Sequence, residues 1–197
     1  MTIRRVLIAN RGEIAVRIIR TCRRLGIGTV LAASEADRDS MPARLADRTL
    51  CIGPARSSYS YLKVDAILQA ALAAHADAIH PGYGFLSERP ALATACEENG
   101  VIFIGPTAAQ IASVGDKLQA RALAQAAAVP VVPGGNVESA AGAAALVRRI
   151  GLPALVKAVG GGGGRGMKRV ERLDDLPRAM HLAQSQAVAA FGDARAY

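Results

Sequence analysis

The chain has 197 residues, of which 51% are apolar and 20% are charged, and its formal net charge is +8. These proportions are typical of an ordered globular protein and exclude a disordered or fibrous chain. The charge comes mostly from arginines spread along the predicted helices, with only four tyrosines and three phenylalanines beside them, so we expect no nucleic-acid partner. No apolar stretch approaches the length of a membrane span and no signal sequence opens the chain, so we expect a cytoplasmic protein that binds no membrane.

The N-terminal part of the chain alternates between strand-like and helix-like patterns. We expect strands at residues 4–9, 29–33, 49–52, 76–79 and 101–104, and helices at 12–25, 64–74 and 90–98. Such alternation predicts an α/β fold, a Rossmann-like doubly wound parallel sheet. Ligands of these sheets bind beyond the carboxyl ends of the strands. The loops at 10–12 and 80–84 each follow a strand, so they should line the same edge.

Beyond the last of these strands the pattern changes. We expect a helix over residues 110–128, a turn over 129–135 and a further helix over 140–150. An apolar strand that contains Lys157 follows, and a glycine-rich loop joins it to a second alternating strand at 167–170. These elements indicate a separate α+β unit.

The glycine-rich loop is the strongest functional signal. Five consecutive glycines, Gly160–Gly164, leave backbone N–H groups free to converge on an anion, and Lys157 on the preceding strand adds a positive charge. The pattern therefore indicates nucleotide phosphate binding, with a flexible linker as the alternative. It is not a Walker A loop, because Met167 and Lys168 stand where that motif needs lysine and then serine or threonine. A dinucleotide fingerprint is also disfavoured, because a strand and not a helix follows the loop.

Several other reactive residue types have structural explanations. Cys22, Cys51 and Cys96 each lie in an apolar segment, so we expect buried free thiols. His80 belongs to a tight turn, and we expect a histidine satisfied by backbone groups and not a catalytic one. Ser87 and Glu88 precede a proline and are expected to begin a helix.

Six motifs occur in the order and approximate spacing of biotin carboxylase, a family of ATP-grasp enzymes. They are Asn10–Ala15, Ala36–Asp39, His80–Glu88, Phe103–Pro106, Gly115–Lys117 and Lys157–Met167. The chain resembles this family over essentially its whole length. The resemblance implies a first domain at residues 1–112 and, at 113–197, the small α+β lobe that begins an ATP-grasp domain, truncated here.

The resemblance also implies a function. The family uses ATP, with Mg²⁺, to carboxylate biotin with bicarbonate. Biotin is held on a biotin carboxyl carrier protein, and a carboxyltransferase completes the acetyl-CoA, propionyl-CoA or pyruvate carboxylase reaction. The acceptor is chosen by that separate partner, so this sequence does not identify it.

Individual positions match residues with known roles in the family. The matches are ATP-binding residues at Lys117, Lys157, Gly162, Gly163, Gly164 and Met167, and a biotin-proximal residue at Tyr83. The lysines and glycines are implied to contact the phosphates, and Met167 to form an apolar wall near the adenine. Tyr83 is implied to lie near the ureido ring of biotin.

A basic stripe on the first predicted helix has two interpretations. Arg17, Arg20 and Arg24 recur at helical spacing. The resemblance implies that Arg17 and Arg20 belong to a homodimer interface. Arg24 departs from the family, which commonly has an acid there, so a solvated helix face stays open as the alternative.

The family's metal-binding carboxylates and its catalytic groups lie beyond the position of Tyr197. We therefore assign no catalytic residue and no metal ligand, and expect an N-terminal fragment that carries part of the ATP site and is inactive alone. The alternative is a catalytically inactive nucleotide-binding or dimerisation module. A nicotinamide-dependent oxidoreductase is disfavoured, because the turn at residues 10–13 contains a single glycine.

Overall fold

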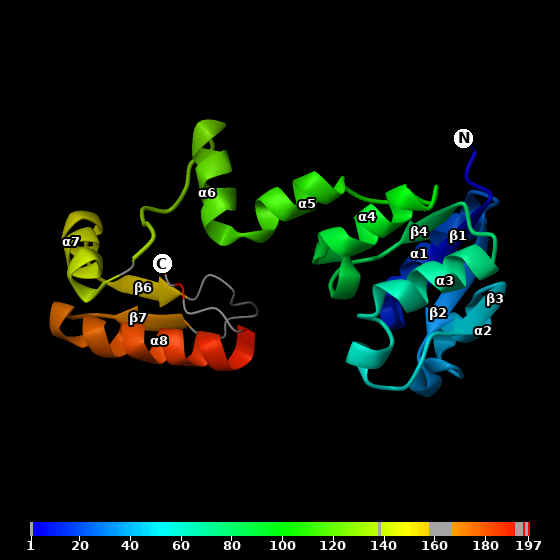
Figure 1. The fold of residues 1–197 in the computed structure, drawn as a ribbon, viewed down its shortest axis with the longest axis horizontal. Helices are drawn as coiled ribbons and strands as arrows, with labels where there is room; N and C mark the ends of the chain where they lie inside the picture. Colours follow the sequence, from blue (N-terminus) through cyan, green and yellow to red (C-terminus); the bar gives the residue numbers. More distant parts are fainter. Residues whose placement is uncertain (1, 138, 158–166, 192–194, 196) are drawn as a thin grey trace. The chain divides into compact units, whose positions relative to one another are not determined.

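The structure is a computed structural model that describes residues 2–137, 139–157, 167–191, 195 and 197. The chain divides into two compact units, Met1–Ala112 and Ser113–Tyr197 (Figure 1), and each is described separately below.

The first unit is built on a five-stranded parallel sheet in the order β3-β2-β1-β4-β5. Its strands are β1 (Arg5–Ile8), β2 (Gly28–Ala33), β3 (Arg48–Cys51), β4 (Ala78–His80) and β5 (Ile102–Phe103). The chain adds strands outward from β1 to β3 and then returns to the other side of β1 for β4. The carboxyl ends of β1 and β4 therefore form the switch point at which ligands of such sheets bind. The prediction of an α/β fold with a parallel sheet is confirmed.

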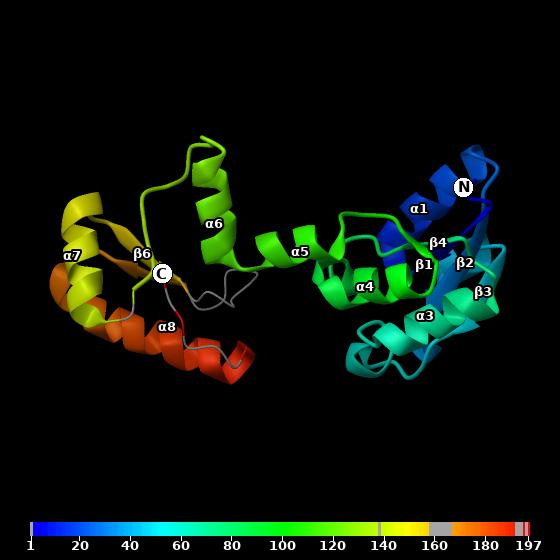
Figure 2. The same cartoon turned by 45° about the horizontal axis from the view of Figure 1, so that its top comes forward.

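Helices cover both faces of this sheet. They are α1 (Gly12–Arg24), α2 (Met41–Leu45), α3 (Val64–Ala73) and α4 (Pro90–Glu98), and Figure 2 shows α1 and α3 on opposite sides of the strands. Within β1, Leu7 packs into the cluster that contains α3 and α4, whereas Val6 and Ile8 pack into the cluster that contains α1. The strands are apolar at successive positions because both of their faces are buried.

The first helix shows how the pattern determines the packing. Ala15, Ile18, Ile19 and Cys22 recur at the spacing of one helical face, and all four are buried. The chain then turns at Gly26, whose φ of +68° suits glycine, and enters β2.

In the second unit a two-stranded antiparallel sheet packs against helices. The elements are α6 (Lys117–Ala126), α7 (Ala140–Ile150), β6 (Ala154–Lys157), β7 (Met167–Val170) and α8 (Leu176–Phe191). Ala154, Val156 and Val170 point from the sheet into a core that they share with α7 and α8. The predicted strand, glycine-rich loop and second strand do form a hairpin.

Three expectations need correction. The helix predicted over 110–128 is two helices, α5 (Ala108–Gly115) and α6, because the Asp116 carboxylate accepts hydrogen bonds from the backbone N–H groups of Leu118 and Gln119 and caps a new helix. Cys51 is exposed, since it ends the edge strand β3, although Cys22 and Cys96 are buried as predicted. Residues 85–88 form a separate 3-10 turn that ends before α4, so Ser87 and Glu88 do not begin that helix.

Among the described residues, no helix is both long enough and apolar enough to cross a membrane.

Candidate functional site

A hollow of about 530 Å³ opens at the switch point of the parallel sheet. It is lined by the loop after β1, the loop after β4 and one residue that follows β2. The lining residues are Asn10, Arg11, Gly12, Glu13, Ile14, Asp37, Tyr83, Gly84 and Phe85. The prediction that the loops at 10–12 and 80–84 line the same edge is confirmed.

Asn10 joins these two loops. Its side chain is fully buried, and its amide nitrogen donates to the carbonyl oxygens of Pro81 at 2.7 Å and Tyr83 at 2.9 Å. Its side-chain oxygen accepts from the Arg11 N–H at 2.9 Å. Gly82, between the two carbonyls, has a φ of +67°, and a Cβ there would lie 2.6 Å from the Asn10 amide nitrogen. Asparagine at position 10 and glycine at position 82 therefore require each other.

The Arg11 guanidinium lies against two aromatic rings. Its central carbon is 5.7 Å from the ring centroids of both Tyr61 and Phe85, which stack on each other at 5.1 Å. Asp37 lies 3.7 Å from Arg11 and accepts a hydrogen bond of 2.7 Å from the Tyr61 hydroxyl. That hydroxyl also accepts from the buried Ser34 N–H, and burial raises the pKa of Tyr61 to about 12.

The sequence analysis assigned no role to Arg11, Asp37 or Tyr61. A signal was present for two of them, because Arg11 and Asp37 follow the neighbouring strands β1 and β2, whose carboxyl ends meet at one edge. Tyr61 follows no strand directly, and nothing in the local sequence indicates its contact with Asp37.

Tyr83 and His80 differ in what they offer this hollow. The Tyr83 side chain is 67% exposed, and its hydroxyl donates to Glu13 at 3.1 Å. This hydrogen bond to a carboxylate raises the pKa of Tyr83. His80 instead accepts the Gly82 N–H on Nδ1 at 3.0 Å, and burial lowers the pKa of its ring, so it is neutral near pH 7. The expectation of a structural histidine is confirmed.

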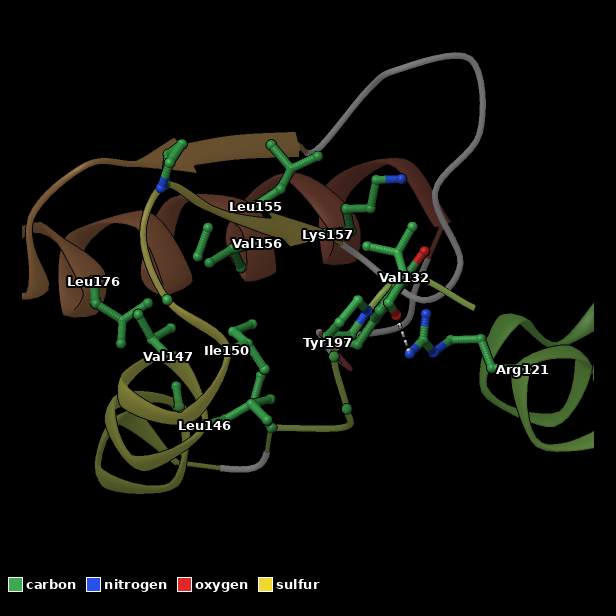
Figure 3. A pocket seen from close by; sticks show the side chains of 18 of the residues that line it. Arg121, Val132, Leu146, Val147, Ile150, Leu155, Val156, Lys157, Leu176 and Tyr197 are labelled. Atoms are coloured by element: carbon green, nitrogen blue, oxygen red, sulfur yellow. Dashed lines mark hydrogen bonds between the residues drawn. The ribbon is translucent and has the colours of Figure 1, made fainter. Parts of the chain in front are cut away.

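The second unit contains a hollow of about 630 Å³ beside β6. Figure 3 shows Leu146, Val147 and Leu176 at one end of it. Lys157 and Arg121 lie at the other end, where the Arg121 guanidinium donates to the Val132 carbonyl oxygen at 2.8 Å. The hollow therefore combines an apolar part with two cationic side chains.

Arg121 was not singled out from the sequence. It lies on α6 four residues after Lys117, so the two side chains share one face of the helix. This spacing was the signal that could have found it. Lys117 itself is the first residue of α6, directly after the capping Asp116, as its position in the sequence suggested. Asp116 also pairs with Arg195 at 3.1 Å.

The hairpin brings two predicted residues together. Lys157 and Met167 are direct partners in the β6–β7 register, so their side chains stand on the same face of the sheet. That face is opposite the core, since Val156 between its neighbours points into the core. Lys157 is half-buried and Met167 is 40% exposed. Gly162, Gly163 and Gly164 lie outside the described residues.

The remaining predicted residues lie on α1. Arg17 and Arg20 are both exposed, on the helix face opposite the buried Ile18 and Ile19. The Arg17 guanidinium donates to the Thr21 hydroxyl one turn along the same helix. Within the part of the chain that the structure describes, no three His, Cys, Asp or Glu side chains gather as a group that could hold a metal ion.

Comparison with known families defines the class of the protein. Residues 2–111 match the family described as biotin carboxylase, N-terminal domain, and residues 116–197 match the ATP binding domain of the carbamoyl-phosphate synthase L chain. A doubly wound domain is thus followed by the beginning of an ATP-binding domain. The chain belongs to the biotin carboxylase family.

Similar sequences agree with this assignment. The chain is 48% identical over 196 residues to biotin carboxylase of Pseudomonas aeruginosa, and covers 98% of itself and 44% of that protein. It is 47% identical over 195 residues to a pyruvate carboxylase component of Methanothermobacter thermautotrophicus, and covers 98% of itself and 40% of that protein. The chain therefore spans less than half the length of these relatives.

Solved structures give the same result. A biotin carboxylase complex from Campylobacter jejuni matches with a TM-score of 0.94 and 46% identity, over 100% of this chain and 44% of that one. The biotin carboxylase domain dimer of 2-oxoglutarate carboxylase from Hydrogenobacter thermophilus, a complex with MgADP and bicarbonate, matches with a TM-score of 0.92 and 40% identity. That match also covers 100% of this chain and 44% of the other.

Proposed function

We propose that this chain supplies part of the site of an ATP-dependent biotin carboxylase, which carboxylates biotin on a biotin carboxyl carrier protein with bicarbonate. The observation that carries the proposal is the β6–β7 hairpin. It presents Lys157 and Met167 side by side on its outer face, at the ends of the strands that the glycine-rich segment joins. A cation beside an apolar side chain suits a ligand that has both phosphates and a flat base.

In this proposal the nucleotide is bound by the second unit. Lys157 and Lys117 contact the phosphates as positive charges, and the backbone N–H groups of Gly162, Gly163 and Gly164 cradle them. Met167 packs against the adenine. The match of residues 116–197 to an ATP-binding domain supports this division of roles, as do the relatives whose structures contain ADP or an ATP analogue.

Biotin is proposed to meet the first unit at Tyr83. The side chain is exposed at the rim of the 530 Å³ hollow, which lies where ligands of doubly wound sheets bind. Arg17 and Arg20 are proposed to lie in a homodimer interface, since both are exposed and the Hydrogenobacter thermophilus relative is a dimer. A carboxyltransferase is the proposed partner that uses the carboxylated carrier.

Mg²⁺ is expected to accompany ATP and to offset the negative charge of its phosphates. The described residues do not fit a resident Mg²⁺ site, because they form no suitable group of carboxylates. The curated relatives are more than twice as long as this chain. We therefore propose that turnover requires residues beyond these 197, and that the chain alone binds nucleotide without completing the reaction.

The first experiment measures binding of a fluorescent ADP analogue to the 197-residue chain. We expect Lys157→Ala to weaken binding by about 10-fold, since a hydrogen bond to a charged group contributes roughly 1.5 to 3 kcal/mol. Lys63→Ala is the matched control, a lysine of the first unit, and should leave the dissociation constant unchanged. Equal binding by the wild type and Lys157→Ala would contradict the nucleotide site.

A second experiment measures ADP release that depends on bicarbonate and biotin, with Mg²⁺ present. We expect none above the Lys157→Ala background. Turnover that the substitution abolishes would show a complete site in this chain and would refute the need for further residues. Nucleotide binding without turnover, even after the longer chain is supplied, would favour an inactive nucleotide-binding module.

A further inference from the structure

The Tyr83 hydroxyl already has a partner in the absence of any ligand. Its oxygen lies 3.1 Å from a carboxylate oxygen of Glu13. An ionised carboxylate can only accept hydrogen bonds, so the phenol is the donor and its single proton is used. The phenol oxygen keeps its lone pairs, and through them it can accept a hydrogen bond from a third group.

Both ends of this contact are held in place. Glu13 lies in the first turn of α1, and Tyr83 follows the glycine turn that Asn10 holds through the carbonyl oxygens of Pro81 and Tyr83. Gly82 leaves no space for this turn to shift toward Asn10. The backbone that carries Tyr83 is therefore set by a buried side chain, and its phenol is set by Glu13.

We propose that Glu13 is a positioning residue that holds Tyr83 as a hydrogen-bond acceptor toward a ligand in the 530 Å³ hollow. The ligand class is a molecule that presents an N–H donor at this point. This inference rests on the proposed function, in which the ligand is the ureido ring of biotin, and it adds that Tyr83 receives a ring N–H and does not donate to the ring carbonyl.

Two other arrangements are chemically reasonable, and each predicts a different result. The ligand could bind the Glu13 carboxylate directly, in which case Tyr83 would be dispensable. Alternatively, the Tyr83 hydroxyl could turn away from Glu13 and donate to the ligand, in which case removing the Glu13 charge would not weaken binding. Arg11 and Asp37 are the other charged residues that line the hollow, and both are unchanged in the variants below.

The test uses the 197-residue chain with ¹³C-labelled tyrosine rings, followed by NMR. The Tyr83 signal is assigned by its loss in Tyr83→Phe. In the wild type the Glu13 carboxylate holds the pKa of Tyr83 above its ordinary value of 10.0. We expect Glu13→Gln to lower this pKa toward the ordinary value, while Glu98→Gln, at an exposed glutamate of the same unit, leaves it unchanged.

The same samples are then titrated with free biotin. We expect the Tyr83 signal to move, and both Tyr83→Phe and Glu13→Gln to weaken biotin binding by about 3- to 10-fold, the range of one neutral hydrogen bond. Binding by Glu13→Gln that equals or exceeds the wild type would overturn the acceptor role, and so would unchanged binding by Tyr83→Phe.

Failure of the inference and failure of the proposed function give different results. If Glu13→Gln does not change the pKa of Tyr83, the positioning role of Glu13 is wrong, whatever biotin does. If the pKa changes but biotin moves no Tyr83 signal in the wild type, the proximity of biotin to Tyr83 is wrong, and the acceptor role is overturned with it.

Discussion

Replacing Gly82 by alanine should destabilise the first unit more than its backbone angle alone predicts. An alanine at a φ of +67° costs about 1 to 2 kcal/mol. The new Cβ would also lie 2.6 Å from the Asn10 amide nitrogen and 2.8 Å from the Ile14 methyl carbon Cγ2. Displacing the buried Asn10 amide leaves a carbonyl without its donor, which costs roughly 1 to 3 kcal/mol more.

Gly84 provides the matched control. It lies in the same loop with a φ of +68°, but a Cβ there meets nothing within 4 Å. Gly84→Ala should therefore cost only the conformational part, about 1 to 2 kcal/mol, and Gly82→Ala about 2 to 5 kcal/mol. The difference between the two variants isolates the contact with Asn10.

Urea unfolding followed by tyrosine fluorescence measures this difference. The sequence has no tryptophan, and three of its four tyrosines lie in the first unit. The midpoint of the transition should fall further for Gly82→Ala than for Gly84→Ala. Equal losses for the two variants would refute the argument that Asn10 and Gly82 require each other.

Three further predictions concern other parts of the molecule. Tyr61→Phe should cost about 1 to 3 kcal/mol in urea unfolding, because a buried backbone N–H loses its acceptor. Two hydrogen bonds from Thr29 lower the pKa of Asp47 below its ordinary value of 3.8. Since unfolded Asp47 takes up a proton at higher pH than folded Asp47, the stabilisation is present above that value and is lost as acid titrates the folded carboxylate, and Asp47→Asn should flatten this decline. A thiol reagent should modify exposed Cys51 in the native chain and reach Cys96, whose pKa burial raises to about 11, only on unfolding.

Each of these predictions has a control and a contrary outcome. Tyr59→Phe, at a tyrosine that is 55% exposed, should change stability by less than about 0.5 kcal/mol. A loss as large as that of Tyr61→Phe would contradict the role of burial. Asp39→Asn, at an exposed aspartate, should leave the acid dependence of unfolding unchanged. Modification of all three cysteines at one rate in the native chain would mean that the two buried thiols are accessible.

Local sequence patterns were sufficient for much of the fold. Parallel strands buried on both faces are nearly continuous apolar runs, and α1 shows one helical stripe, so these elements were recognisable one at a time. The hairpin of β6 and β7 was also recognisable, because the glycine run separates two strand-like segments. The division of the helix at Asp116 was missed, although a capping residue stands at that point in the sequence.

Burial was harder to predict than the elements. Cys51 lies between two apolar residues, Leu50 and Ile52, and the sequence therefore suggested a buried thiol. Its exposure depends on β3 being the edge strand of the sheet, which no local pattern shows. Which strand lies at an edge is decided by the order of the strands.

The sequence by itself therefore determined the parallel α/β unit, the glycine-containing hairpin and the pairing of Lys157 with Met167, because each depends on residues close together in the chain. Only the tertiary structure decided the site at the switch point. Tyr83 and Glu13 are 70 residues apart and Asp37 and Tyr61 are 24 apart, yet each pair is joined by a hydrogen bond. Such contacts have no periodic signal, since they exist only after the strands have assembled and their carboxyl ends have met.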